Sequence, residues 1–136
     1  MIVIDASALV KYLLEEDGLQ RVGPFIHGKR PLYSVDHVLK ECLNALWKHC
    51  YLRRVLGVDT VMNIVRGLMK LVDTGVIVLE DERKYLEEAL EISLRTGITV
   101  YDALYVAQAL RYGELLTADR GQAEVARSMG IHVYLV

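Results

Sequence analysis

Residues 1–5 read Met1-Ile2-Val3-Ile4-Asp5, a short run of apolar, largely β-branched residues that ends at an acid. A continuous apolar run of this length favours a strand that is buried on both faces, as in a parallel sheet. The same stretch has neither a basic lead nor a small-residue cleavage site, so it does not look like a secretory signal. We therefore expect a central strand at the start of a cytoplasmic protein.

Strands and helices are expected to alternate along the rest of the chain. Further apolar runs predict strands at 31–34, 76–79, 115–117 and 131–136. Helices are expected over 7–16, 19–26, 36–53, 59–73, 82–95, 102–112 and 120–129, with Asp36 and Asp59 as N-caps. This alternation predicts an α/β fold with a mainly parallel sheet and helices on both of its faces. Functional residues should then lie beyond the carboxyl ends of the strands.

Length and composition limit the class of protein. The 136 residues suit one domain spanning 1–136, and no apolar run approaches the roughly 18 residues that cross a bilayer. The net charge of −2 lacks the basic excess that is typical of nucleic-acid binders. Cys42 and Cys50 lie on one expected helix, about 12 Å apart, so we expect two buried, reduced thiols and no disulfide.

Four acids occupy positions where a functional site of this fold is expected. Asp5 ends the first strand and Asp119 follows the fourth, so both fall on the carboxyl edge of the sheet. Glu41 lies beside the apolar stripe of a long helix, and Asp102 opens a helix that is apolar nearly all round. Mg²⁺ and Mn²⁺ prefer oxygen ligands, and clustered carboxylates repel one another without a cation. The four acids together predict a divalent metal site that activates water and stabilises a phosphoryl oxygen.

Each of these acids also has a purely structural alternative. Asp119 heads Asp-Arg-Gly-Gln, which is typical of a capping box, and Asp102 could favour the positive end of its helix dipole. Asp5 could cap the first helix together with Ser7, and Glu41 could be a solvated helix residue. For any one acid these alternatives are as good as a metal role. The occurrence of all four at one edge favours the metal site.

Four segments resemble a known family. The start at 3–11, Val-Ile-Asp-Ala-Ser-Ala-Leu-Val-Lys, resembles the opening of PIN-domain proteins, particularly the VapC-like toxins. The segments 39–46, 100–107 and 116–121 resemble the other blocks of that family, in the same order. The resemblance implies a three-layer α/β/α sandwich and a metal-dependent endoribonuclease that cleaves RNA with a metal-activated water. It also implies that Asp5, Glu41, Asp102 and Asp119 bind one or two Mg²⁺ or Mn²⁺ ions.

The resemblance also implies supporting residues and partners. Ser7, Asn44 and Thr117 match positions that line the site of the family. Such proteins usually form homodimers, and many are inhibited by an antitoxin whose tail fills the active-site groove. The alternative is a non-catalytic RNA-binding or assembly module, whose RNA binding would survive chelation of metal. A phosphotransfer enzyme or receiver domain is disfavoured, because Ser7 stands where such phosphatases carry a second Asp and the acidic pair of receivers is missing.

Contact with RNA needs cations and planar groups near the acids. The cationic candidates are Arg120, which adjoins Asp119, and Lys11, Lys48, Arg53 and Arg54. Tyr12, Tyr101 and Tyr105 could stack on bases, although packing in the protein is the alternative for each. The helix at 59–73 has a wide apolar face extended by Met62 and Met69. This face is either core or a surface for an antitoxin helix or a second subunit.

Overall fold

A five-stranded parallel sheet forms the centre of the computed structural model, which describes residues 1–136 apart from the side chain of Glu16. The strands are β1 (Ile2–Ile4), β2 (Leu32–Val35), β3 (Ile77–Glu80), β4 (Glu114–Thr117) and β5 (His132–Leu135). Their order is β3-β2-β1-β4-β5, and every neighbouring pair is parallel. All three residues of β1 are buried, so the apolar run at the start of the chain is the middle strand, as predicted.

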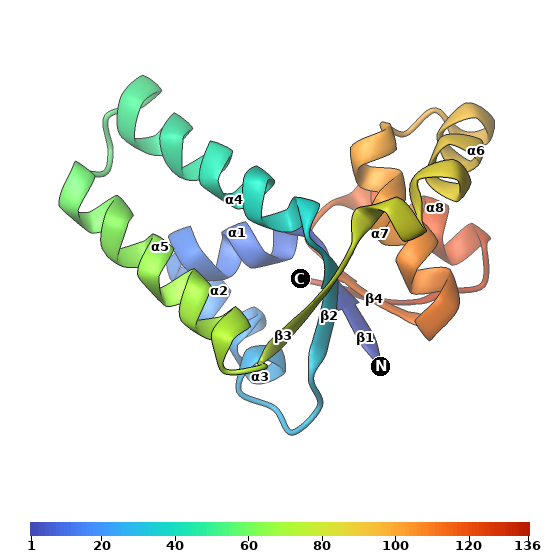
Figure 1. Ribbon diagram of the computed structural model, residues 1–136, viewed down its shortest axis with the longest axis horizontal. Coiled ribbons are helices and arrows are strands. Elements are labelled where there is room, and N and C mark those ends of the chain that lie inside the picture. Colours follow the sequence, from blue (N-terminus) through green and yellow to red (C-terminus); the bar gives the residue numbers. More distant parts are fainter.

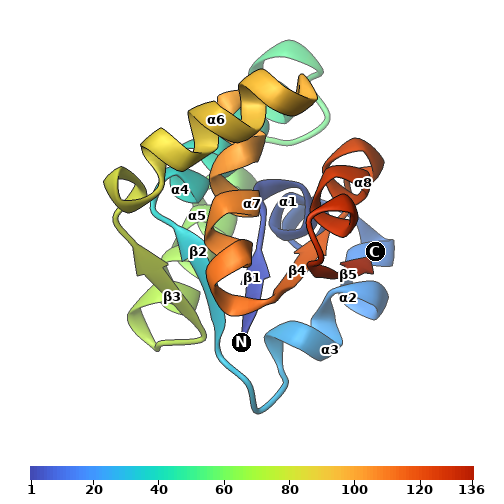
Figure 2. The same ribbon diagram turned by 90° about the vertical axis from the view of Figure 1, so that its right-hand side faces the viewer.

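Helices cover both faces of the sheet, which confirms the three-layer α/β/α arrangement (Figures 1 and 2). One layer holds the helices that connect β1, β2 and β3, and the opposite layer holds those that follow β3. The first layer contains α1 (Ala6–Leu14), α2 (Glu16–Arg21), α3 (Gly23–Ile26), α4 (His37–Trp47), the π-helical turn η1 (Lys48–Leu52) and α5 (Val58–Asp73). The second contains α6 (Leu86–Thr96), α7 (Val100–Tyr112) and α8 (Arg120–Ser128), after the short 3₁₀ turn η2 (Glu82–Lys84).

Helix α7 lies between the sheet and α6, and its residues from Ala103 to Ala109 are all buried. The helix begins two residues earlier than predicted, because the side chain of Thr99 accepts a hydrogen bond from the amide of Asp102 (3.2 Å) and caps the helix. Gly113 ends it at a φ of 91°, a left-handed conformation that favours glycine. Asp102 therefore lies within the first turn of α7 rather than at its start.

Two predicted helices have a different course. The helix expected over 19–26 is split into α2 and α3, because Pro24 fits the first turn of a new helix but not the interior of a continuous one. The helix expected over 36–53 leaves α geometry after Trp47 and continues as η1. Of the two cysteines, Cys42 is buried as expected, whereas Cys50 is only half-buried.

Of the two expected N-caps, Asp36 is the N-cap residue of α4, whereas Asp59 was wrong. Asp36 stands at the start of α4, but its carboxylate accepts the amide of Glu82 (3.1 Å) rather than an amide of the helix. Gly57 is the N-cap residue of α5, and Asp59 lies in the first turn. The Asp36 carboxylate therefore connects α4 to the chain that follows β3.

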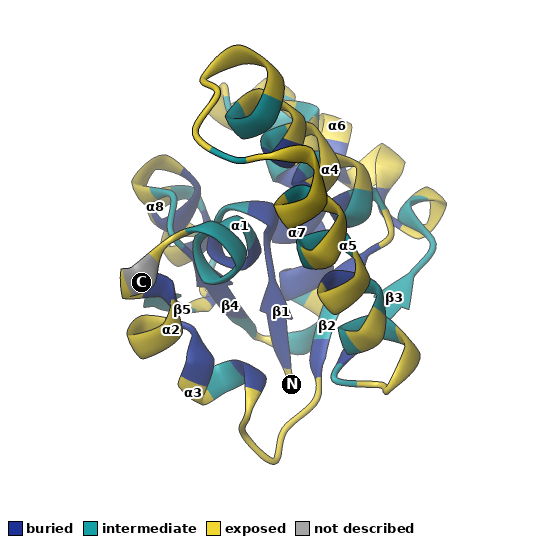
Figure 3. Cartoon of the chain, turned by 90° about the vertical axis from the view of Figure 1, so that its left-hand side faces the viewer, coloured by how far each residue is buried: buried dark blue, intermediate teal, exposed yellow. Residues whose placement is uncertain are grey.

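The segments α4, η1 and α5 project beyond the sheet, and we call them the arm (Figures 1 and 3). Leu68 of α5 is buried at the base of the arm. Exposed apolar side chains gather toward its far end: Trp47, Tyr51, Leu52, Val55, Val58 and Met62. The predicted apolar face of 59–73 is therefore core at one end only. None of the described helices combines the length and the apolarity that crossing a membrane requires.

Candidate active site

The order of the strands reverses between β1 and β4, since β1 is followed by strands on one side and β4 by a strand on the other. In open parallel sheets, ligands bind beyond the carboxyl ends of the strands at such a point. Asp5 directly follows β1, and Asp119 lies two residues after β4. The register pairs Ile4 with Leu116, so the two strands end side by side. The topology therefore brings both acids to the edge where a site is expected.

Asp5 is held by hydrogen bonds from three residues. The hydroxyl of Thr117 donates to Oδ2 (2.5 Å), and the hydroxyl of Ser7 lies 2.8 and 2.9 Å from the two carboxylate oxygens. The amide of Ala8 donates to Oδ1 (2.9 Å), so Asp5 also caps α1. Only 1% of Asp5 is exposed. Asp5 therefore caps a helix, as the structural alternative predicts, and also lies at the carboxyl edge of the sheet, where a functional site is expected.

Burial raises the pKa of Asp5 to about 7, against the opposing effect of the hydrogen bonds from Thr117, Ala8 and Ser7. The negative charge of Asp102 raises this pKa further. Loss of hydration penalises the charged form of a buried carboxyl group more than these donors stabilise it. A nearby cation would lower the pKa of Asp5 again, because it favours the charged form of the carboxyl group.

The loops after β1 and β4 are joined by the same two hydroxyls. Ser7 Oγ accepts the amide of Ala118 (2.9 Å), and Thr117 Oγ1 accepts the amide of Asp119 (3.0 Å). Asp119 in turn accepts the amide of Gln122 (2.9 Å) and caps α8, as the capping-box alternative predicts. Ser7 and Thr117 therefore position carboxylates and backbone, rather than projecting free hydroxyls into the site.

Asp102 and Glu41 approach the edge from α7 and α4. Burial raises the pKa of the Asp102 carboxyl group, and the charges of Asp119 and Glu41 raise it further. The hydroxyl of Tyr105 donates to Glu41 Oε1 (2.8 Å), and His37 Nε2 lies 3.2 Å from the same oxygen. Two other predicted acids thus raise the pKa of Asp102, and the charge of Asp102 raises the pKa of Asp5. All four acids therefore interact electrostatically and form one cluster.

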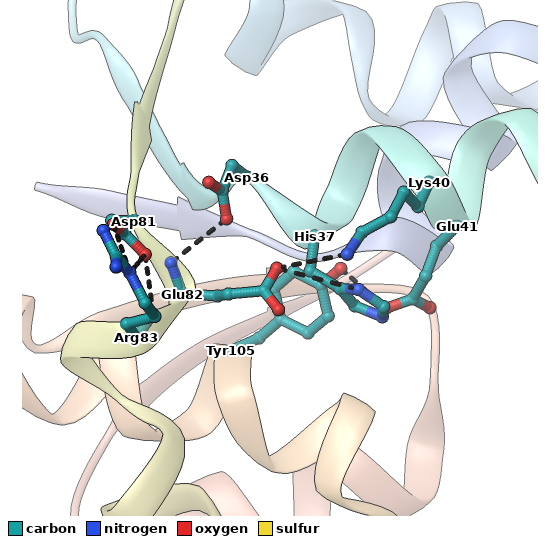
Figure 4. A network of polar contacts seen from close by, with 8 residues as sticks. All are labelled: Asp36, His37, Lys40, Glu41, Asp81, Glu82, Arg83 and Tyr105. Carbon is teal, nitrogen blue, oxygen red and sulfur yellow. Dashed lines mark hydrogen bonds and ion pairs between the residues drawn. The ribbon is translucent and has the colours of Figure 1, made fainter.

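His37 belongs to a polar network beside Glu41 (Figure 4). Its Nδ1 lies 3.9 Å from a carboxylate oxygen of Glu82, which also pairs with Lys40 (3.5 Å). The imidazole stacks on the ring of Tyr101, with centroids 5.0 Å apart and planes 13° from parallel. Sequence reasoning missed His37, although its spacing of four residues from Glu41 places both on one helix face.

Two neighbouring cavities share Glu41 and Asp102 in their walls. The smaller has a volume of about 210 Å³, and its polar lining includes Asp5, Ser7, Tyr105 and Gln122. The larger has a volume of about 480 Å³ and is also lined by His37, Lys40, Asn44, Thr99 and Tyr101. Asp119 lines neither of these two cavities among the described residues and lies near Asp102 instead. Three predicted acids therefore border a common hollow at the carboxyl edge.

Comparison with known proteins agrees with this geometry. The PIN domain family matches residues 2–128, a span that contains all four acids. The chain belongs to the PIN domain family. This PIN domain is also 32% identical over 124 residues to Ribonuclease VapC3 of Pyrobaculum aerophilum, a match that covers 90% of the chain and 92% of the relative. Both findings confirm the resemblance carried by the four segments of the sequence.

The donor set of the PIN domain fits a hard divalent cation, because it consists of carboxylate oxygens. Among the described side chains, no Lys or Arg pairs with any of the four acids, and the one ion-pair partner of Glu41 is His37. Within the same described residues, however, no three His, Cys, Asp or Glu side chains meet closely enough to enclose an ion. The fold gathers the acids around a space without bringing them into contact.

The predicted RNA-binding cations of the PIN domain lie outside the two cavities. Lys11 pairs with Asp17 (3.3 Å) and Glu15 (3.8 Å), whereas Lys48 and Arg120 are exposed at the starts of η1 and α8. None of these three is in the described lining of either cavity. Lys40 is the lysine that lines the larger one. Its position next to Glu41 in the sequence was the available signal.

Proposed function

We propose that this PIN domain, residues 1–136, is a cytoplasmic, metal-dependent endoribonuclease and the toxin of a toxin–antitoxin pair. The observation that carries the proposal is a buried carboxylate, Asp5, whose charge has no cationic partner among the described residues and which shares a cavity with Glu41 and Asp102. Similarity to Ribonuclease VapC3 supports RNA as the substrate. The four acids disfavour one another's charged forms, and the non-catalytic alternative offers no reason for such a cluster.

Asp5, Glu41, Asp102 and Asp119 would hold one or two Mg²⁺ or Mn²⁺ ions. When bound, such an ion lowers the pKa of a coordinated water and stabilises charge on a phosphoryl oxygen. The chain supplies the positioning of the ligands. Hydroxyl and amide donors fix both oxygens of Asp5, whereas Tyr105 and His37 contact one oxygen of Glu41. The second oxygen of Glu41, Oε2, has no hydrogen-bond partner among the described residues and is available to a cation.

The proposal is tested by Asp102→Asn and by chelation. Replacing the carboxylate with an amide of the same shape should lower RNA cleavage by more than about 100-fold, beyond the usual effect of residues that only support metal ligands. Ethylenediaminetetraacetate should abolish cleavage by the parent protein, and Mn²⁺ should restore it. Cleavage is measured on labelled RNA, with circular dichroism as the check on folding.

Asp59→Asn is the matched control, because Asp59 also lies in the first turn of a helix but is exposed on the arm. It should cleave RNA like the parent protein. Undiminished cleavage by Asp102→Asn, or cleavage in the presence of the chelator, would contradict the metal site. RNA binding that survives chelation without any cleavage by the parent would instead establish the non-catalytic alternative.

The exposed apolar end of the arm supports the partner side of the proposal. Large contiguous apolar patches on a protein surface mark interaction sites. We assign this end to contact with a second copy of the chain, and the groove at the acids to a segment of a cognate antitoxin.

In sedimentation experiments, the double variant Val58→Glu/Met62→Glu should be monomeric. Leu94→Glu, a control at an exposed leucine of α6, should leave the dimer intact. A monomeric parent, or a double variant that remains dimeric, would refute the arm interface.

A further inference from the structure

The larger cavity beside the acids presents an aromatic ring on a fixed support. Tyr101 is 61% exposed, and one face of its ring is stacked on His37. His37 is itself held in place, with a side chain only 12% exposed between Glu41 and Glu82. Stacking on a buried neighbour reduces the freedom of an exposed side chain, so the ring of Tyr101 is a preorganised flat surface.

The polar residues around this ring complement a nucleotide. Lys40 is exposed, and its ion pair with Glu82 at 3.5 Å is of the surface kind that contributes little to stability. The lysine can therefore exchange this partner for a phosphate. Asn44 is exposed, and its amide offers two donors and an acceptor to the edge of a base. A ring, an amide and a cation thus line one cavity.

We propose that the larger cavity binds an unpaired RNA base next to the scissile phosphate, with Tyr101 stacked on the base. Asn44 contacts the edge of the base, and Lys40 contacts a phosphate of the backbone. The inference rests on the proposed function, because Glu41 and Asp102 line both cavities and so place this base beside the phosphate held at the acids. Bases within a duplex are covered on both faces, so the substrate must be single-stranded or looped at this position.

The test is the cleavage of a single-stranded RNA oligonucleotide by variants of Tyr101. Stacking on an aromatic side chain contributes enough to binding that Tyr101→Ala should raise KM by about 5- to 100-fold. The effect should appear in KM rather than kcat, because stacking next to the scissile bond binds substrate and transition state alike. Tyr101→Phe keeps the ring and should match the parent protein, and Tyr101→Trp should bind at least as tightly.

A set of substrates with one abasic nucleotide each identifies the base that is bound. At one position near the cleavage point, the abasic substrate should raise the KM of the parent protein about as much as Tyr101→Ala does. The two changes together should add nothing further, since each removes the same contact. Additive losses at every position would overturn the proposal, as would equal cleavage of duplex and single-stranded RNA.

The outcomes separate this inference from the function beneath it. If the parent protein cleaves RNA with Mn²⁺ but Tyr101→Ala has an unchanged KM, the base-binding cavity is refuted and the nuclease remains. If the parent protein cleaves no RNA, the proposed function fails and this inference fails with it. Circular dichroism of Tyr101→Ala excludes a loss of folding as the cause of a raised KM.

Discussion

Two carboxylates at opposite ends of β4 have pKa values shifted in opposite directions. At its amino end, hydrogen bonds from Arg30 and Tyr134 contribute to lowering the pKa of Glu114 to about 2. At its carboxyl end, Thr117 donates to Asp5, whose pKa burial raises to about 7. Glu114 has a cationic partner and Asp5 has none among the described residues. The first carboxylate therefore stabilises the fold, whereas the second costs stability, as is common for groups kept for chemistry.

The largest expected effect is the pH dependence caused by Asp5. In metal-free protein, the unfolded chain releases this proton near the ordinary pKa of 3.8, but the folded chain keeps it until about pH 7. The folded state therefore binds more protons in this window, and the free energy of unfolding falls as the pH rises. The total contribution is on the order of 4 kcal/mol. Urea unfolding across this window, in the presence of a chelator, measures it.

Two controls sharpen this prediction. Asp5→Asn should flatten the fall, because the amide does not titrate in this window. Mn²⁺ should raise the stability of the parent protein near neutral pH and leave Asp5→Asn unchanged, since a ligand stabilises the state that binds it. If the stability of the metal-free parent rises with pH throughout this window, the contrast between the two ends of β4 is wrong.

A smaller effect is expected from Thr117→Val, which keeps the shape of the side chain but removes its hydroxyl. Asp5 loses its 2.5 Å donor, and the amide of Asp119 loses its acceptor. The loss of stability should be about 1–3 kcal/mol. RNA cleavage should fall about 10- to 100-fold, as for residues that orient metal ligands. Thr60→Val, at an exposed threonine of α5, should change neither quantity; unaltered cleavage by Thr117→Val would show that Asp5 needs no such positioning.

The smallest effect is expected at the other end of the strand. Glu114→Gln should lower the free energy of unfolding by about 0.5–1 kcal/mol at neutral pH, because its ion pair is close to solvent. Since the folded-state pKa is depressed, this contribution is full above the ordinary value of 4.5 and disappears as the pH falls through about 2. Urea unfolding at neutral and acidic pH should show that pattern. If Glu114→Gln were more stable than the parent protein, the ion pair between Glu114 and Arg30 would not stabilise the fold.

Local patterns were sufficient for the strands and for the edge at which two acids lie. Ile2–Ile4 are apolar without interruption because β1 is covered on both faces, and Asp5 follows it directly. A parallel sheet collects the carboxyl ends of its strands, so Asp119 could be placed at the same edge from its position after an apolar run. Helix starts were less predictable, because a side chain such as Thr99 caps α7, which begins two residues before its predicted start.

Contacts between distant segments had no signal in one sequence. The hydroxyl of Thr117 reaches Asp5 across 112 positions, and Tyr105 reaches Glu41 across 64. Such pairs depend on the order of strands and the packing of α7 against the sheet, which local propensity does not encode. The sequence alone allows Tyr105 to stack on a base, but the residue is buried and its hydroxyl donates to Glu41 instead. The structure was also needed to show that Lys40, rather than the predicted Lys11, lines the larger cavity.

The pairing of β1 with β4 has a consequence for synthesis. The first strand leaves the ribosome early, yet the partner that supplies Thr117 emerges only after more than a hundred further residues. Contacts of such long range are costly to close and form late. A nascent chain interrupted before Thr117 lacks both the donor to Asp5 and the acid at 119. The four acids can therefore come together only after residue 119 has been synthesised, long after β1.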